Sequence, residues 1–228
     1  MPHIDKYFDK ELEELKGSVL QLGGMVEGQV LDAIKALMDN DIGLAKRTIK
    51  RDFNVNKLEV EIDERCMQIL ALRQPVVADL RFVATALKII DNLERMGDMA
   101  VNISERVYDL AAEPRLKRYI DIPKIAEIAT GMMKNSLDAF VERNVDLAYK
   151  VIRDDDDVDD MTDQIFRELL VFMLEDSNTI KRAIRIMFIS KYLERIADHA
   201  TNIAEMVVYM VKGKIIRHTE PEDEQDAE

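Results

Sequence analysis

The chain has 228 residues, of which 47% are hydrophobic and 34% charged, and its formal net charge is −13. Nucleic-acid-binding surfaces are normally basic, so this acidic balance excludes nucleic acid as an expected partner. A single cysteine excludes an intrachain disulfide and favours a reducing, cytoplasmic setting, and the absence of tryptophan with only 8 glycines and 5 prolines favours long helices over a turn-rich sheet.

The first half of the chain predicts three long helices. Over residues 4–37 the apolar side chains recur with a mean spacing of about 3.7, which is the period of an α-helix. A break at residues 40–41 separates this helix from a second one over about 42–72. The second helix ends before Pro75, because proline disfavours helical conformation in the residue that precedes it. A third helix is expected over about 76–112.

The second half repeats this order after a connecting segment. Residues 114–123 contain two prolines and several basic side chains, which is typical of a linker. Helices are expected over about 124–143 and 145–174, and a sixth runs from capping residues at 176–178 to about residue 211. The longest uninterrupted apolar run, residues 206–211, is far shorter than the ~20 residues of a membrane-spanning helix, so a soluble protein is expected.

An internal duplication relates the two halves. The stretch LERMGDMAVNISE at 93–105 returns as LERIADHATNIAE at 193–205, with eight of thirteen positions identical. In the preceding helices, Leu44-Ala45 and Leu147-Ala148 align at an offset of 103, and further matches follow. One chain therefore contains two related units.

These observations predict an all-α fold of two tandem antiparallel three-helix bundles, six helices in total. The expected units are residues 1–113 and 124–212, joined by the linker 114–123. The acidic residues 213–228 are expected to form a disordered tail, because such a segment has little apolar surface to bury. The sequence does not indicate whether the two bundles pack side by side or end to end.

The duplicated stretch places acidic side chains along one stripe of its helix. On a helical wheel Asp98 lies about 40° from Glu94, and the stripe borders the apolar face. Like charges one turn apart repel by about 0.2–0.5 kcal/mol, and carboxylates at the edge of a core need a cation near them. The second helix of each half carries a matching acidic series that begins at Asp52 or Asp155. Two clusters of oxygen ligands between helix pairs are therefore predicted.

The pattern alone leaves two interpretations of these clusters open. Ligand sets made only of oxygen suit Mg²⁺, Ca²⁺ or Mn²⁺ and can also hold iron. Alternatively, Arg95, Arg195 or cations on adjacent helices form a salt-bridge network that needs no metal. Histidine is scarce, and the wheel directs His199 away from the acidic stripe, so we expect it to be a solvated surface residue. Cys66 is expected to be a buried small hydrophobe.

The duplicated motif, together with the stretch PVVADLR at 75–81, resembles the PhoU family of phosphate-signalling proteins over about residues 8–212. The resemblance implies a cytoplasmic negative regulator that keeps phosphate uptake and the phosphate-starvation regulon off when phosphate is plentiful. It implies an adaptor between the ATPase of the phosphate ABC transporter and a sensor histidine kinase, and not an enzyme. We expect a homodimer that meets the membrane only through these partners.

The resemblance also implies a multinuclear metal site that holds iron, manganese, magnesium or zinc, with iron or manganese favoured. The residues onto which the acidic motifs of the family fall are Asp52, Asn56, Glu94 and Asp98 in the first half, and Asp155, Asp159, Glu194 and Asp198 in the second. Because Asn56 carries no charge, unequal metal occupancy of the two sites is expected.

Two other functions remain as alternatives. A di-metal carboxylate oxidase in a ferritin-like bundle also projects acids inward, but it usually carries Glu-x-x-His pairs. Here the residues three positions before His199 and His218 are Ile196 and Ile215. The other alternative is a metal-free helical scaffold on which protein partners dock. The sequence contains neither a phosphate-cradling glycine loop nor a zinc-ligand spacing.

Overall fold

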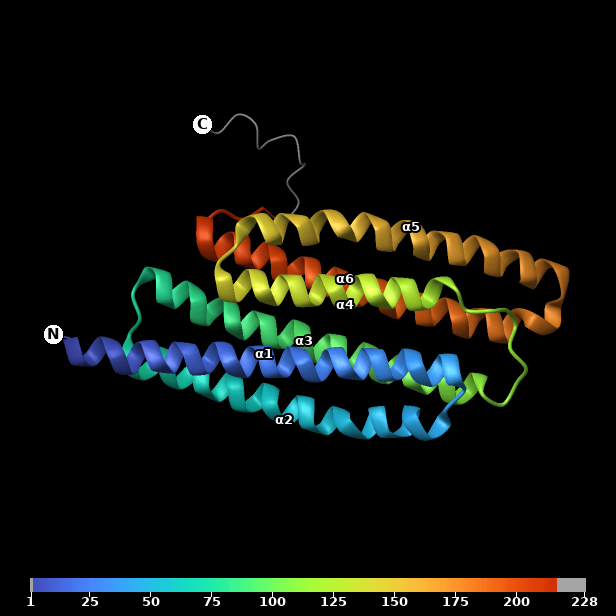
Figure 1. Cartoon of the computed structure of the whole chain (residues 1–228), viewed down its shortest axis with the longest axis horizontal. Helices are drawn as coiled ribbons and strands as arrows, with labels where there is room; N and C mark the ends of the chain where they lie inside the picture. The colour runs from blue at the N-terminus through green and yellow to red at the C-terminus, as the bar shows by residue number, and fades with distance from the viewer. Residues whose placement is uncertain (1, 217–228) are drawn as a thin grey trace, which may run out of the picture.

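The structure, a computed structural model, describes residues 2–216, with side chains from residue 7 onward. Most of this part of the chain is helical, and no strand occurs in it (Figure 1). The elements are α1 (Pro2–Asp39), α2 (Ile42–Arg73), α3 (Val77–Leu110), α4 (Asp121–Glu142), α5 (Val145–Glu175), the 3₁₀-helix η1 (Ser177–Thr179) and α6 (Ile180–Lys212). The predicted all-α fold is confirmed. Most of the expected acidic tail, residues 217–228, lies outside the described residues.

The duplication reaches the helix junctions. Asp41 caps α2 by accepting a hydrogen bond from the backbone N–H of Leu44 at 2.9 Å. Asn144, 103 positions later, caps α5 in the same way through the N–H of Leu147 at 3.0 Å. Such caps satisfy backbone donors that a helix leaves unpaired at its start. The same local chemistry therefore separates the first two helices of each half.

Two helix starts differ from the sequence prediction. Helix α4 begins at Asp121, before the expected position 124, so Pro123 lies in the first helical turn and not in the linker. Proline is tolerated there because the N–H groups of the first turn have no intrahelical acceptor. Helix α6 begins only at Ile180, after η1, whose N-cap Asp176 accepts from the N–H of Asn178 at 2.9 Å.

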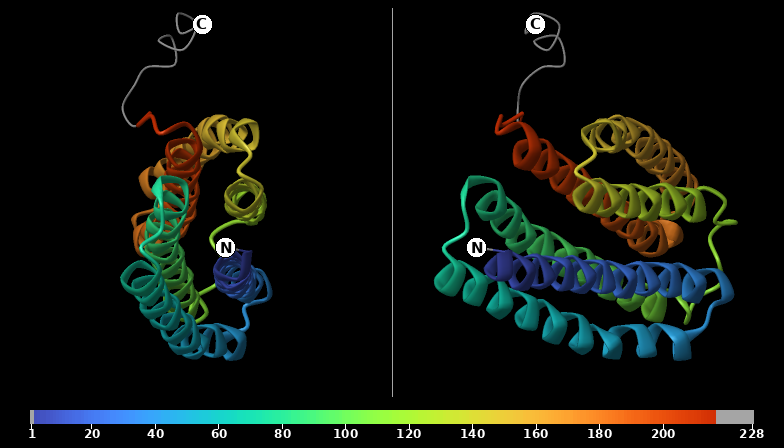
Figure 2. Two further views of the ribbon diagram at one scale, coloured as in Figure 1. Left: turned by 90° about the vertical axis from the view of Figure 1, so that its left-hand side faces the viewer. Right: turned by 60° about the vertical axis from the view of Figure 1, so that its left-hand side comes forward.

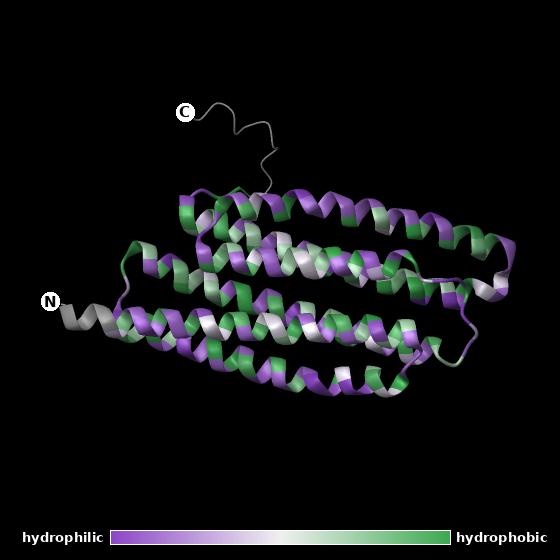
Figure 3. Ribbon diagram, viewed as in Figure 1, coloured by the Kyte–Doolittle hydropathy of each residue, from purple (hydrophilic) through white to green (hydrophobic). Residues whose placement is uncertain are grey.

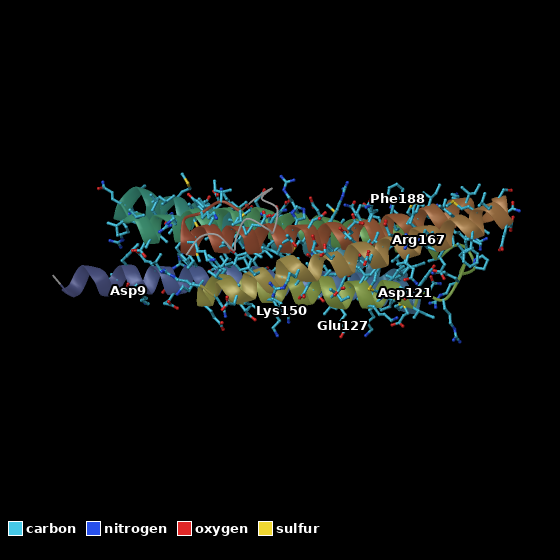
Figure 4. The ribbon with its side chains drawn as sticks, turned by 90° about the horizontal axis from the view of Figure 1, so that it is seen from above. Asp9, Asp121, Glu127, Lys150, Arg167 and Phe188 are labelled. Carbon is cyan, nitrogen blue, oxygen red and sulfur yellow. The ribbon has the colours of Figure 1, made fainter. Side chains whose placement is uncertain are left out.

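The two halves pack side by side (Figure 2). Helices α1–α3 form one group and α4–α6 the other, and the groups meet through α3 against α6 and α1 against α4. Figure 4 shows these pairs as neighbouring layers, with the exposed side chains of Glu127 and Lys150 on one outer side and Phe188 on the other. None of the described helices contains a segment that is long and apolar enough to cross a membrane.

Close apolar contacts join the halves. A methyl group added at Gly23 of α1 would come within 2.2 Å of Leu137 Cδ1 in α4, so the missing side chain allows the two helices to approach. The rings of Phe82 in α3 and Phe140 in α4 stack with centroids 4.8 Å apart. Both rings are fully buried. Burial of aromatic side chains at this contact stabilises the side-by-side arrangement.

Candidate functional site

The first acidic cluster lies where α2 packs against α3. Asp52 of α2 is partly buried, and its Oδ2 accepts a hydrogen bond from Asn56 Nδ2 at 3.1 Å. The helices meet at Gly97 of α3, where an added methyl group would lie 3.4 Å from Asp52 Oδ1. The close approach brings Asp52 next to the α3 carboxylates Glu94 and Asp98, which are near enough for their charges to interact with it.

The carboxylates of this first cluster repel one another. Burial raises the pKa of Glu94, and the charges of Asp98, Asp91, Glu59 and Asp52 raise it further. The pKa of Asp98 is also raised, first by burial and then by Asp52. Partly desolvated acids of like charge disfavour their ionised forms in this way. The cluster therefore favours a positive group placed among its oxygens.

The second acidic cluster lies at the equivalent position between α5 and α6. Burial raises the pKa of Asp155 to about 6, helped by Asp198 and Asp159 and opposed by the Thr201 hydroxyl. Burial raises the pKa of Asp159, and the charge of Glu194 raises it further. Burial also raises the pKa of Asp198, and the charge of Asp159 raises it further. Two facing helices thus gather carboxylates in both halves, as the sequence predicts.

Salt bridges neutralise the clusters only in part. Arg95 pairs with Asp91 (Nε to Oδ2, 3.3 Å), and among the described residues no ion pair reaches Glu94 or Asp98. In the second cluster Lys191 Nζ lies 2.7 Å from Glu194 Oε2. Lys191 therefore lowers the net negative charge of the second cluster. The expectation of unequal metal occupancy considers only the uncharged Asn56 of the first cluster and does not include this effect.

The ligand chemistry of the clusters fits a hard cation. All of their candidate ligands are carboxylate or amide oxygens, which suit magnesium, manganese or iron. Asn56 Oδ1 is buried and accepts no hydrogen bond within the described part of the chain, so it is available as a ligand. No three His, Cys, Asp or Glu side chains in this part converge closely enough to hold an ion as they stand. A bound cation would therefore require some of the carboxylates to rotate toward it.

A known protein family matches the chain twice, once in each three-helix group. The family model described as "PhoU domain" matches residues 19–107 and again 122–207. The chain belongs to the PhoU family. The phosphate-specific transport system accessory protein PhoU of Escherichia coli K12 is 39% identical over 216 residues, which cover 95% of this chain and 90% of that protein.

Crystal structures of PhoU proteins share the fold. PhoU from Pseudomonas aeruginosa superposes with a TM-score of 0.87 at 41% identity, covering 91% of this chain and 100% of that one. The phosphate transport system regulatory protein PhoU from Streptococcus pneumoniae gives a TM-score of 0.86 at 30% identity, with coverages of 92% and 99%. Each PhoU-domain match lies within one three-helix group and includes one acidic cluster.

Sequence reasoning missed one residue at the first cluster of this PhoU-family chain. Gln29 of α1 is only 3% exposed and donates through Nε2 to Asp52 Oδ1 at 3.4 Å. Its Oε1 is buried and has no hydrogen-bond partner among the described residues. The second half carries Met132 at the equivalent position. A polar residue inside the apolar stripe between Val26 and Val30 was the signal that could have identified it.

The prediction for His199 was wrong. Its side chain is half-buried between α3 and α6, and its Nδ1 lies 2.9 Å from Asn92 Oδ1. Burial lowers the pKa of His199, and the charge of Arg95 lowers it further. The helical wheel correctly directs this residue away from the acidic stripe, but the other half of the molecule covers that side of α6. His199 therefore belongs to the contact between the two PhoU domains and not to the solvated surface.

Proposed function

We propose that this chain is a regulatory accessory protein of phosphate transport. It acts in the cytoplasm, where it holds back phosphate uptake and the phosphate-starvation response when phosphate is plentiful. Support comes from its relatives, which are named as accessory or regulatory proteins of phosphate transport and match this chain over nearly its whole length. The observation that carries the proposal is the pair of carboxylate clusters, one in each PhoU domain.

In this proposal the protein is an adaptor and not an enzyme. As a homodimer it contacts the ATPase of the phosphate ABC transporter and a sensor histidine kinase, and it reaches the membrane only through them. The elongated helical rods offer a large surface for such contacts (Figure 1). An oxidase is not favoured, since His199 contacts Asn92 between the halves and lies outside the acidic clusters.

The acidic clusters are proposed to bind a multinuclear centre of iron or manganese, with magnesium or zinc as the other candidates. The ligands would be Asp52, Asn56, Glu94 and Asp98 in the first domain, and Asp155, Asp159, Glu194 and Asp198 in the second. The metal would supply positive charge. The carboxylates would hold it between α2 and α3, and between α5 and α6, and thereby link the two helices of each pair.

Affinity purification from cells grown with and without phosphate tests this function. The tagged chain is expected to retain the transporter ATPase or the sensor kinase, in amounts that depend on phosphate. A matched variant with Glu94→Gln, Asp98→Asn, Glu194→Gln and Asp198→Asn reports whether the clusters matter. If neither protein is retained under either condition, and deletion of the chain leaves a phosphate-starvation reporter unchanged, the proposed function is wrong.

A further inference from the structure

An apolar stripe runs along the outer surface of α2. Phe53, Val60 and Met67 are 73%, 52% and 55% exposed. They follow one another at intervals of seven residues, so they share one face of the helix. No other described element of the chain covers them. Single exposed apolar residues are ordinary, but a regular row on one face is typical of a surface that packs against another helix.

The second domain shows that the fold itself does not need this stripe. At the offset of 103 that aligns α2 with α5, Phe53 and Val60 correspond to Asp156 and Asp163, which are both exposed. Figure 3 shows a hydrophilic stretch in the middle of α5, where these two aspartates lie. Met67 corresponds to Leu170, which is itself 39% exposed, so the contrast is confined to Phe53 and Val60. The two domains share the fold and the acidic cluster, but they differ at these two positions. Phe53 and Val60 therefore serve a purpose that α5 does not share.

The charge pattern of α2 indicates what covers the stripe. Residues 42–58 contain five basic side chains and one acidic side chain, whereas residues 59–73 contain four acidic and two basic. The helix is therefore complementary to a copy of itself that runs in the opposite direction. Val60 lies close to the change of sign and at the centre of the stripe.

We propose that α2 is the surface through which two copies of this chain associate, with the two α2 helices antiparallel and crossing at Val60. Val60 then packs against Val60 of the second copy, and Phe53 packs against Met67 of the second copy. Lys57 faces Glu64 of the second copy on each side of the axis. A twofold contact of this kind repeats each interaction twice. The inference rests on the homodimer that forms part of the proposed function, and it identifies the interface.

Replacement of the stripe by the residues of the second domain tests the proposal. Phe53→Asp with Val60→Asp introduces the side chains that α5 carries at these positions, so the fold is expected to persist, as circular dichroism would show. Sedimentation equilibrium should then give a dissociation constant at least about a hundredfold higher than that of the unchanged chain. A dimer of unchanged affinity would overturn the α2 interface. An unchanged chain that stays monomeric at every concentration would overturn the dimer itself.

Charge reversal provides a second measurement. Lys57→Glu is expected to raise the dissociation constant about tenfold, because two equivalent ion pairs are replaced by repulsion. Adding Glu64→Lys to the same chain should restore the original value, since the pair is then exchanged and not lost. If the double variant binds no better than Lys57→Glu alone, these residues do not face each other and the antiparallel arrangement is wrong.

Disulfide trapping fixes the direction of the helices. Val60→Cys should form a cross-linked dimer under mild oxidation, whereas Asp163→Cys, at the equivalent position of α5, should not. Phe53→Cys alone should also fail, because antiparallel packing separates the two positions by about 21 Å, far beyond the ~7 Å limit between Cα atoms of a disulfide. The unchanged chain is the control. Its single cysteine, Cys66, is buried, and burial raises the pKa of its thiol to about 12, so the thiol stays protonated and is not expected to cross-link. Cross-linking through Phe53→Cys would show a parallel pair and overturn the proposal.

Discussion

Removal of one charge from the second acidic cluster is expected to stabilise the protein. Burial, Asp198 and Asp159 raise the pKa of Asp155 from 3.8 to about 6. A carboxyl group whose pKa is higher in the folded than in the unfolded chain destabilises the fold above both values, and this penalty fades as the pH falls from about 6 to 4. One pKa unit corresponds to about 1.4 kcal/mol, so the penalty near pH 8 is roughly 3 kcal/mol, which residual contact with solvent reduces to about 2 kcal/mol.

Asp155→Asn keeps the shape of the side chain and removes its charge. In metal-free buffer we expect the free energy of unfolding to rise by about 2 kcal/mol at pH 8 and to change little at pH 4, where Asp155 is already protonated. Urea titrations followed by circular dichroism at pH 8, 6 and 4 measure this. Asp157→Asn is the matched control, since Asp157 is exposed in the same acidic run and its replacement is expected to change stability by less than about 0.5 kcal/mol.

Two outcomes would refute this reasoning. One is a loss of stability in Asp155→Asn at pH 8, which would mean that the carboxylate makes a favourable contact and is not repelled. The other is a gain of the same size at pH 8 and pH 4, which would mean that charge is not its cause. Addition of Mn²⁺ should stabilise the unchanged chain more than the variant.

Three further changes test other parts of the structure. Gly23→Ala, which crowds the contact between α1 and α4, should lower the free energy of unfolding by about 1–3 kcal/mol. Gly24→Ala, with open space around it, should raise it by up to about 1 kcal/mol, and equal effects in urea titrations would contradict this packing. Gln29→Met removes a buried amide oxygen without a described partner, and it gives up only a long hydrogen bond of 3.4 Å to Asp52. It should therefore stabilise the metal-free chain by about 1 kcal/mol in the same assay, and destabilisation would contradict this. Elemental analysis of Asp98→Ala and Asp198→Ala should give different metal contents, because the first ligand set has an amide where the second has a carboxylate. Equal stoichiometry would count against unequal occupancy.

Much of the fold could be predicted because its determinants are local. The helical period of apolar residues and the breaks near Asp41 and Pro75 define the helices, and the repeated motif relates the halves. The sequence did not indicate how the two halves pack, because their packing depends on how well the surfaces of helices from different halves fit together. The space at Gly23 and the stacking of Phe82 on Phe140 bring together residues that are far apart in the chain.

The acidic clusters could be predicted for a similar reason. Carboxylates one turn apart on a helix share a face, and the duplication shows the pattern twice. A helical wheel does not show what a neighbouring helix contributes, so Gln29 was missed and the environment of His199 was wrong. Lys191 lies three residues before Glu194 on α6, so the spacing along that helix could have identified it. Gln29 and His199 act across helix contacts, where spacing along one helix carries no information.

Metal binding to the purified chain most directly tests the central claim that each PhoU domain gathers carboxylates which require a cation. Equilibrium dialysis against Mn²⁺ or Fe²⁺, followed by elemental analysis, should find at least one ion for each cluster. The variant with Glu94→Gln, Asp98→Asn, Glu194→Gln and Asp198→Asn should bind neither metal while remaining folded. An unchanged chain that binds no ion, or a variant that binds as much metal as the unchanged chain, would contradict the account.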